Sequence, residues 1–298
     1  MSVTPPIIDT ATPEKQTLRL DHSAGPLVVD VWSPRQPTDR LPILLIHGWG
    51  GSGSYWRDTA RALSATNQVI VPDLPGTGRS QPVKKAQNMY DQTATLSYVL
   101  DELGVDRALV IGHSMGGAMG LLLADSQPER VERLILTSLC FFMTETEAQI
   151  FKAAMFMFRI SLGLRHTRLA SLPFFAQMMA TRYFYRTPSD SDLVKQGFQD
   201  FLDLDAATAI ACADNATDPD IEQAGSRMQI PVLLVACRQD QVMPVNNVDY
   251  TVNAIPQCDV RWIDKCGHLP MVEKPAEYLQ IVREFFQLDQ DPKGFTNP

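Results

Sequence analysis

The segment that most constrains the fold of this chain is residues 110–124. A short apolar run leads into Gly112-His113-Ser114-Met115-Gly116, and a helix-prone stretch follows at once. This order predicts a strand, a sharp turn and a helix, with Ser114 at the apex of the turn. Such a turn brings strand and helix together at Gly112 and Gly116, where a Cβ atom would clash. It also points the first N–H groups of the helix towards the serine hydroxyl. We therefore expect Ser114 to be a nucleophile.

Short apolar runs alternate with helix-prone segments along most of the chain. The runs that we expect to be strands are residues 17–20, 26–32, 42–47, 68–72, 108–111, 131–137, 231–236 and 259–263. The first two form a predicted hairpin. Helices are expected from an N-cap at Ser54 to residue 63, and over residues 90–103, 245–255 and 275–288. Because buried strands that alternate with helices specify a parallel sheet, the predicted fold class is α/β, with a doubly wound, mostly parallel, eight-stranded sheet.

The alternation stops between residues 139 and 229, where the sequence predicts several helices and no parallel strand. We expect this segment to be a helical cap inserted into one α/β core, which residues 1–138 and 230–298 would form. Ten of the thirteen phenylalanines and six of the twelve methionines lie in it. Most are expected to pack the cap, and some to face the cleft as an adaptable apolar pocket. The candidates for substrate binding are Phe141, Phe142, Met155, Phe158 and Met178.

Composition excludes several classes of function. The chain has 298 residues and a net charge of −8, which argues against nucleic acid as a general partner. Its five cysteines form no Cys-x-x-Cys pair, which favours reduced thiols in the cytoplasm. The first residues do not have the pattern of a signal peptide, and no apolar run reaches the ~18 residues of a transmembrane span. We therefore expect a cytoplasmic protein without a transmembrane segment.

A nucleophilic serine needs a base, and the chain has five histidines. His22 lies in the early hairpin, His166 lies among basic residues of the insertion, and His113 should point away from its neighbour in the turn. His47 ends a strand and is expected to orient the glycine-rich loop that follows. His268 follows the last strand, at the carboxyl edge where open α/β sheets place their sites. It is the predicted base, which would take the serine proton and later protonate the leaving group.

The acid and the oxyanion donors are expected at the same edge of the sheet. Asp240 follows the penultimate strand and Asp264 lies closer to His268 in sequence; the chain order serine, aspartate, histidine favours Asp240. Asp240 would fix the tautomer of the imidazole and stabilise its charged form. The N–H groups of Met115 and Trp49 are the predicted oxyanion donors. This chemistry requires no metal and no organic cofactor.

Five ordered motifs resemble those of the α/β-hydrolase superfamily. They are His47-Gly48-Trp49-Gly50 as the oxyanion loop, the segment 73–80 (DLPGTGRS) as the DxxGxGxS turn, residues 112–116 as the nucleophile elbow, Asp240 as the acid, and Gly267-His268 as the base loop. Cys237 stands where members often carry glycine. The resemblance implies the α/β-hydrolase fold and a serine hydrolase closest to bacterial carboxylesterases and monoacylglycerol-lipase-like members. The serine argues against the dehalogenase and epoxide-hydrolase branches, which use aspartate.

Charge is segregated within the insertion. Residues 148–189 carry six basic side chains and no acid, whereas residues 190–222 carry nine acids and one lysine. The two halves could pair with each other, or the basic half, which includes Arg165 and Arg168, could contact an anionic lipid surface or an acyl-carrier protein.

Taken together, the residues predict a serine hydrolase that cleaves apolar acyl or aromatic esters through an acyl-enzyme on Ser114. The alternatives are a C–C-bond hydrolase of the meta-cleavage type with the same three residues, and a hydrolase-fold ligand receptor with slow turnover. The C–C-bond hydrolases usually carry a Gly-Pro-Gly element in the oxyanion loop, and residues 50–53 (GGSG) lack it.

Overall fold

An eight-stranded sheet forms the centre of the computed structural model, which describes residues 13–164, 180–187 and 191–290. The strands are β1 (Glu14–His22), β2 (Gly25–Ser33), β3 (Ile43–Ile46), β4 (Val69–Asp73), β5 (Ala108–His113), β6 (Val131–Thr137), β7 (Val232–Cys237) and β8 (Cys258–Ile263). Their order across the sheet is β1-β2-β4-β3-β5-β6-β7-β8. β1 and β2 pair antiparallel and β2 runs antiparallel to β4, whereas all pairs from β4 to β8 are parallel. The predicted fold class and all eight strands are confirmed.

β3 and β7 are apolar throughout because helices cover both faces of the sheet. Successive side chains of a strand point to opposite faces. Leu44 and Val110 therefore join the core beneath α2 (Met89–Glu102) and α3 (Met115–Ser126). Ile43 and Leu109 join the core beneath α1 (Arg57–Leu63) and α11 (Pro275–Phe285). Burial of both faces explains why β3, β5 and β7 have no alternation of polar and apolar residues.

Two helix starts differ from the sequence prediction. Ser52, and not Ser54, is the N-cap, because its hydroxyl accepts the Ser54 N–H at 3.1 Å. It caps the 3₁₀ helix η1 (Gly53–Trp56), which runs directly into α1. Similarly, η3 (Val245–Asn247) precedes α9 (Val248–Ala254). The short η2 (Pro128–Arg130) and α10 (Pro270–Glu273) were not predicted, since single turns carry no periodic pattern.

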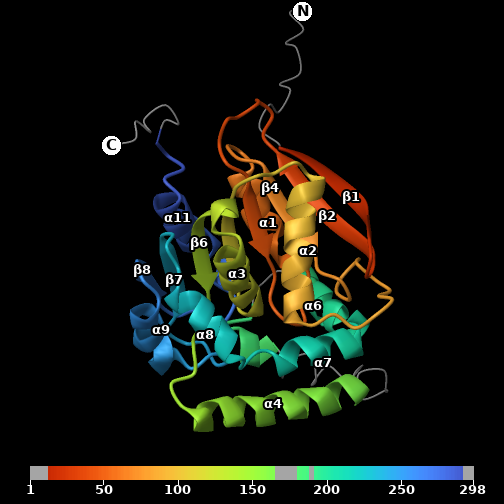
Figure 1. Ribbon diagram of the computed structural model, residues 1–298, viewed down its shortest axis with the longest axis vertical. Coiled ribbons are helices and arrows are strands. Elements are labelled where there is room, and N and C mark those ends of the chain that lie inside the picture. The colour runs from red at the N-terminus through yellow and green to blue at the C-terminus, as the bar shows by residue number, and fades with distance from the viewer. Residues whose placement is uncertain (1–12, 165–179, 188–190, 291–298) are drawn as a thin grey trace, which may run out of the picture.

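The segment between β6 and β7 is helical in the part of it that the structure describes. It contains α4 (Glu145–Leu164), α6 (Ser191–Asp203), α7 (Ala206–Asp214) and α8 (Pro219–Ser226), with no strand among its described residues. Figure 1 shows these helices gathered at one end of the sheet. α8 packs against α3, and α7 against α2 and α4. The division into a core and a cap at residues 139 and 229 stays a prediction.

No helix within residues 13–164, 180–187 and 191–290 combines the length and the hydropathy needed to cross a bilayer.

Candidate active site

Ser114 occupies the turn between β5 and α3 with a backbone that non-glycine residues rarely adopt. Its φ is 52° and its ψ is −123°. Such a conformation costs energy and persists only where the surroundings hold it in place. Here the Ser114 N–H donates to the Thr137 carbonyl of β6 at 2.8 Å, and the Ser114 carbonyl accepts the Gly117 N–H at 2.8 Å. The neighbouring strand and the first turn of α3 therefore fix the backbone of the serine.

The two glycines of the turn have different reasons to be glycine. A Cβ on Gly112 would lie 2.3 Å from the Gly116 carbonyl oxygen, so Gly112 allows strand and helix to approach, as predicted. A Cβ on Gly116 would instead lie 2.5 Å from the carbonyl oxygen of Ile46 in β3. Gly116 therefore allows the start of α3 to pack on the neighbouring strand. The sequence analysis assigned it to the contact with β5, because strand order is not readable from the motif.

Asp240 and His268 form a buried pair. The Nδ1 of His268 lies 2.8 Å from Oδ2 of Asp240, and each side chain is 2% exposed. The second oxygen, Oδ1, accepts the N–H groups of Val242 at 2.8 Å and Met243 at 3.0 Å. Burial opposes the charged carboxylate. The charge and hydrogen bond of His268, with those two N–H groups, outweigh it and hold the pKa of Asp240 below its ordinary value.

Asp264, the competing acid, lies on the surface. Its side chain is 84% exposed and one oxygen lies 3.8 Å from Arg238. The structure therefore brings Asp240, and not Asp264, to His268. The turn that carries Asp240 is closed by the Asp240 N–H, which donates to the Cys237 carbonyl at 3.3 Å, although Cys237 stands where relatives often have glycine.

The loop that carries His268 is fixed by residues 180–186. The His268 N–H donates to the Tyr183 carbonyl at 2.7 Å. A Cβ on Gly267 would lie 2.7 Å from that same carbonyl oxygen, so the residue before the histidine must be small. Glu273 holds the arrangement with both oxygens: Oε1 accepts the Gly267 N–H at 2.7 Å, and Oε2 accepts the Tyr185 N–H at 2.9 Å. The sequence analysis missed Glu273, because nothing in its local pattern indicates these partners.

Hydrogen bonds of His47, Trp49 and Asp73 fix the oxyanion loop that follows β3. The His47 Nε2 accepts the Leu74 N–H at 3.0 Å, and the Nδ1 of His47 lies 2.9 Å from the Gly48 carbonyl, which matches its expected structural role. The Trp49 indole N–H donates to the Ala209 carbonyl of α7 at 2.8 Å. Asp73 accepts the Gly53 N–H at 2.8 Å. These bonds fix the loop that carries Trp49, and Met115 is the first residue of α3.

Two of the remaining histidines lie among the described residues. The ring of His22 packs on Tyr98 in the hairpin region, with 4.9 Å between the ring centroids. His113 is buried and points away from Ser114, as expected, towards Tyr55 and the backbone of His268. Burial, with the charge of His268, holds the pKa of His113 well below its ordinary value, so its ring is neutral. His166 lies outside the described residues.

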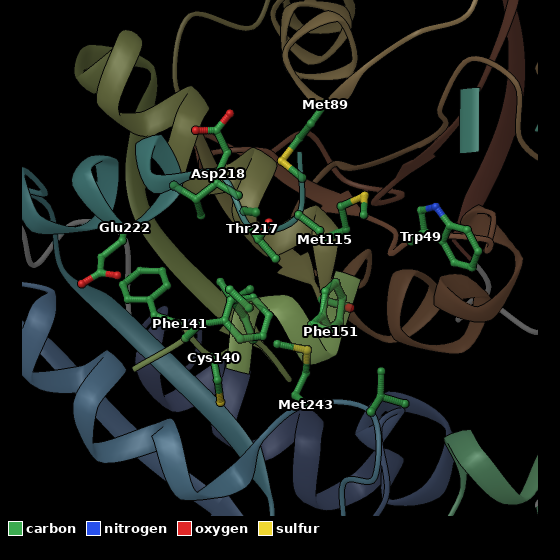
Figure 2. A pocket seen from close by; sticks show the side chains of 18 of the residues that line it. Trp49, Met89, Met115, Cys140, Phe141, Phe151, Thr217, Asp218, Glu222 and Met243 are labelled. Atoms are coloured by element: carbon green, nitrogen blue, oxygen red, sulfur yellow. The ribbon is translucent and has the colours of Figure 1, made fainter. Parts of the chain in front are cut away.

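Ser114, Met115, Trp49 and His268 all line one cavity of about 320 Å³. Figure 2 shows Met89, Met115, Phe151 and Met243 around the same space. Other residues that line the cavity are Leu139, Cys140, Phe141, Phe142 and Ile221. The chemistry and the apolar walls therefore meet in a single site.

Two of the five residues predicted to bind substrate line the cavity, and their role in substrate binding stays a prediction. Phe141 and Phe142 line the cavity, and the Phe142 ring packs on Phe151 with 5.1 Å between centroids. The side chains of Met155 and Phe158, and all of Met178, lie outside the described residues. Met89, the first residue of α2, and Met243, which lies between β7 and η3, also line the cavity and were not predicted. No group of three or more His, Cys, Asp or Glu side chains among the described residues is arranged to hold a metal ion.

Comparisons with known proteins find several hydrolases that are similar to this chain. The "Putative carbamate hydrolase RutD" of Pseudomonas syringae pv. syringae (strain B728a) is 27% identical over 252 residues, which cover 84% of this chain and 95% of that protein. The 2-hydroxy-6-oxononadienedioate/2-hydroxy-6-oxononatrienedioate hydrolase 2 of Pseudomonas putida is 26% identical over 265 residues, covering 82% and 87%. A thermophilic esterase from Thermogutta terrifontis superposes with a TM-score of 0.73 at 23% identity over 92% of this chain and 98% of the esterase.

The sequence profile of the α/β hydrolase fold matches residues 42–275, which is most of the chain. The structural likeness to the esterase supports the same fold. The chain therefore belongs to the α/β-hydrolase fold family.

Proposed function

We propose that this hydrolase cleaves carboxylic esters through an acyl-enzyme on Ser114. The observation that carries the proposal is the 2.8 Å bond between His268 and Asp240 in a cavity that Ser114 also lines. A carboxylate can only accept, so the neutral ring carries its proton on Nδ1 and leaves Nε2 free to act as a base. The pair is 2% exposed, and burial of this kind strengthens its electrostatic interaction.

In the proposed reaction each of these groups has its own role. Ser114 Oγ attacks the ester carbonyl while His268 Nε2 takes the hydroxyl proton, and Asp240 stabilises the resulting imidazolium. The N–H groups of Trp49 and Met115 would receive the oxyanion, each such donor contributing about 3 kcal/mol in the transition state. His268 then protonates the departing alcohol. A water molecule, deprotonated by the same histidine, releases the acid from Ser114.

The cavity walls support an apolar acyl or aromatic substrate. Phe141, Phe142, Phe151 and Met243 line the cavity that Ser114 also lines, and such side chains bind apolar groups through burial and adaptable packing. The similar proteins are named as a putative carbamate hydrolase, a 2-hydroxy-6-oxononadienedioate/2-hydroxy-6-oxononatrienedioate hydrolase and an esterase. All three names indicate hydrolysis, and the named substrates differ.

A panel of p-nitrophenyl esters of increasing acyl length, run beside Ser114→Ala, tests the proposal. We expect turnover with medium acyl chains, loss of turnover in Ser114→Ala, and a shift of the preference to longer chains in Phe151→Ala, which widens the cavity. If the wild type and Ser114→Ala were equally inactive on every ester of the panel, the ester proposal would be wrong.

The same panel separates the two alternatives. A C–C-bond hydrolase would turn over a meta-cleavage product faster than any ester. A ligand receptor would release one equivalent of p-nitrophenol and then stall, because its deacylation is slow. The Pseudomonas putida relative is the reason to include the meta-cleavage product.

A further inference from the structure

A chain of hydrogen bonds connects the oxyanion loop with the base loop through the residue that precedes the nucleophile. The Gly48 N–H donates to the Tyr55 hydroxyl at 2.6 Å. The Tyr55 hydroxyl lies 2.9 Å from Nδ1 of His113. The Nε2 of His113 lies 2.9 Å from the carbonyl oxygen of His268. Gly48 directly precedes Trp49, so this chain joins the two loops that the proposed reaction needs.

The direction of every bond in this chain is determined by its ends. The Gly48 N–H can only donate, and the His268 carbonyl can only accept. Since the Tyr55 oxygen accepts from Gly48, its single hydrogen is available for Nδ1 of His113. The proton of the neutral imidazole then lies on Nε2 and is donated to the His268 carbonyl. The neutral His113 ring therefore has one tautomer, which accepts from the Tyr55 hydroxyl through Nδ1 and donates to the His268 carbonyl through Nε2.

Close packing accompanies the hydrogen bonds. A Cβ on Gly48 would lie 2.9 Å from Nδ1 of His113 and 3.2 Å from the Ser114 Cβ, so the oxyanion loop contacts the serine turn without intervening side chains. The rings of His113 and His268 meet edge to face with 4.7 Å between their centroids. Tyr55 and His113 meet in the same way at 5.4 Å. The His113 ring is thus held on both sides.

We propose that Tyr55 and His113 are positioning residues, which hold the oxyanion loop and the base loop at one fixed separation across Ser114. Neither contacts the substrate's reacting atoms in this role: His113 acts on the backbone of the base, and Tyr55 acts on the backbone next to the oxyanion donor. Loss of either hydrogen-bonding group lets the loops move apart by fractions of an ångström, which affects the transition state more than substrate binding. The inference rests on the proposed function of Ser114 and His268.

The test uses Tyr55→Phe, His113→Leu and the double variant, with Tyr98→Phe as the matched control. Tyr98 donates to the Asp21 carbonyl at the surface at 3.0 Å, so the control removes a tyrosine hydroxyl far from the site. The measurements are kcat and KM on the best ester, the rate of Ser114 phosphonylation by a fluorophosphonate, and the thermal midpoint. A proton spectrum records the low-field resonance of the His268 Nδ1–H.

Removal of a whole oxyanion donor costs 10²–10³-fold in other enzymes, so we expect a displaced donor to cost about 10- to 30-fold in kcat with little change in KM. Phosphonylation should slow by a similar factor. The double variant should be no slower than the worse single variant, because the two residues act as one unit. The low-field resonance should shift in His113→Leu and stay in place in Tyr98→Phe.

The inference is overturned if Tyr55→Phe keeps kcat and the phosphonylation rate within about twofold of wild type, or if the two single effects multiply in the double variant. Should His113→Leu fail to fold, Tyr55→Phe decides alone. If no ester is cleaved but Ser114 is phosphonylated, the ester function fails and the phosphonylation rates still decide the positioning role. Absence of phosphonylation at Ser114 in the wild type overturns both.

Discussion

Replacing Asp240 with asparagine exchanges one carboxylate oxygen for an NH₂ group at a position where every polar atom has a partner. In the native site Oδ2 accepts from His268, and Oδ1 accepts from Val242 and Met243. The asparagine can keep only one of these arrangements. If its NH₂ group faced the N–H groups of Val242 and Met243, buried donors would point at one another. Each donor left without an acceptor would lower the free energy of unfolding by about 1–3 kcal/mol.

The less costly arrangement keeps the amide oxygen on the two backbone N–H groups and turns the NH₂ towards His268. Nδ1 must then be an acceptor, so the proton of the ring moves to Nε2, and the base can no longer accept the Ser114 proton. A forced tautomer of this kind lowers kcat by about 10⁴-fold in serine proteases, which corresponds to about 5 kcal/mol in the activation free energy. We expect the same order of loss in Asp240→Asn.

The assay is kcat on the best p-nitrophenyl ester, with Asp264→Asn as the matched control. The control makes the same chemical change on a side chain that is 84% exposed, and it should keep kcat within about twofold. A folded Asp240→Asn that lost less than about tenfold would refute the assignment of Asp240 as the residue that fixes the tautomer. An equal loss in Asp264→Asn would refute the choice between the two acids.

The stability difference between the wild type and Asp240→Asn should also depend on pH. The folded site holds the pKa of Asp240 below its ordinary value, so the unfolded chain binds more protons on this group than the folded one. Its contribution is present above the unfolded pKa of about 3.9 and is lost as the pH falls through the folded pKa. The difference in thermal midpoint between wild type and Asp240→Asn should therefore narrow between pH 6 and pH 3; a constant difference contradicts the shift.

Three further predictions concern the surroundings of the site. Gly112→Ala should lower the free energy of unfolding by about 3 kcal/mol, because its Cβ would lie 2.3 Å from the Gly116 carbonyl oxygen. Gly197→Ala in α6, which has open space around it, should instead raise the thermal midpoint. Equal changes of the thermal midpoint in the two variants would contradict this prediction. Glu273→Gln should lower kcat about tenfold, because one amide oxygen cannot accept both the Gly267 N–H of the base loop and the Tyr185 N–H. An unchanged kcat would contradict the role of Glu273. Arg165 and Arg168 lie outside the described residues, and contact of the basic half of the insertion with an anionic lipid surface stays a prediction. If that contact exists, reversal of both charges weakens binding to anionic vesicles at least tenfold in sedimentation, at about 1 kcal/mol per basic residue; unchanged binding rules out the anionic lipid surface.

The sequence was informative where one local pattern determines both structure and chemistry. The central parallel strands contain apolar runs because both faces of the sheet are covered, and β1 and β2 were recognised as a hairpin, so all eight strands could be located. The turn at Ser114 needs glycine before and after it, and the carboxyl edge of the sheet collects the loops of Asp240 and His268. Fold and acid-base pair therefore follow from residues close to the strands.

The sequence was uninformative where function depends on contacts between distant segments. Tyr55 and Glu273 are polar residues on short helices, and their partners lie on other loops. Met89 at the start of α2 and Met243 after β7 also line the cavity, so enrichment of phenylalanine and methionine in the insertion identified only part of the pocket. The capping residue was assigned to Ser54 instead of Ser52 because both serines precede the helix, and only backbone geometry separates them.

The acyl-enzyme on Ser114 is the central claim, and intact-mass spectrometry of enzyme quenched within one turnover tests it most directly. Wild type mixed with p-nitrophenyl butyrate should gain the mass of a butyryl group, mapped by proteolysis to Ser114, and Ser114→Ala should gain none. Turnover of the ester with no acyl group on Ser114 at any quench time, or an acyl group on another residue, would contradict the account.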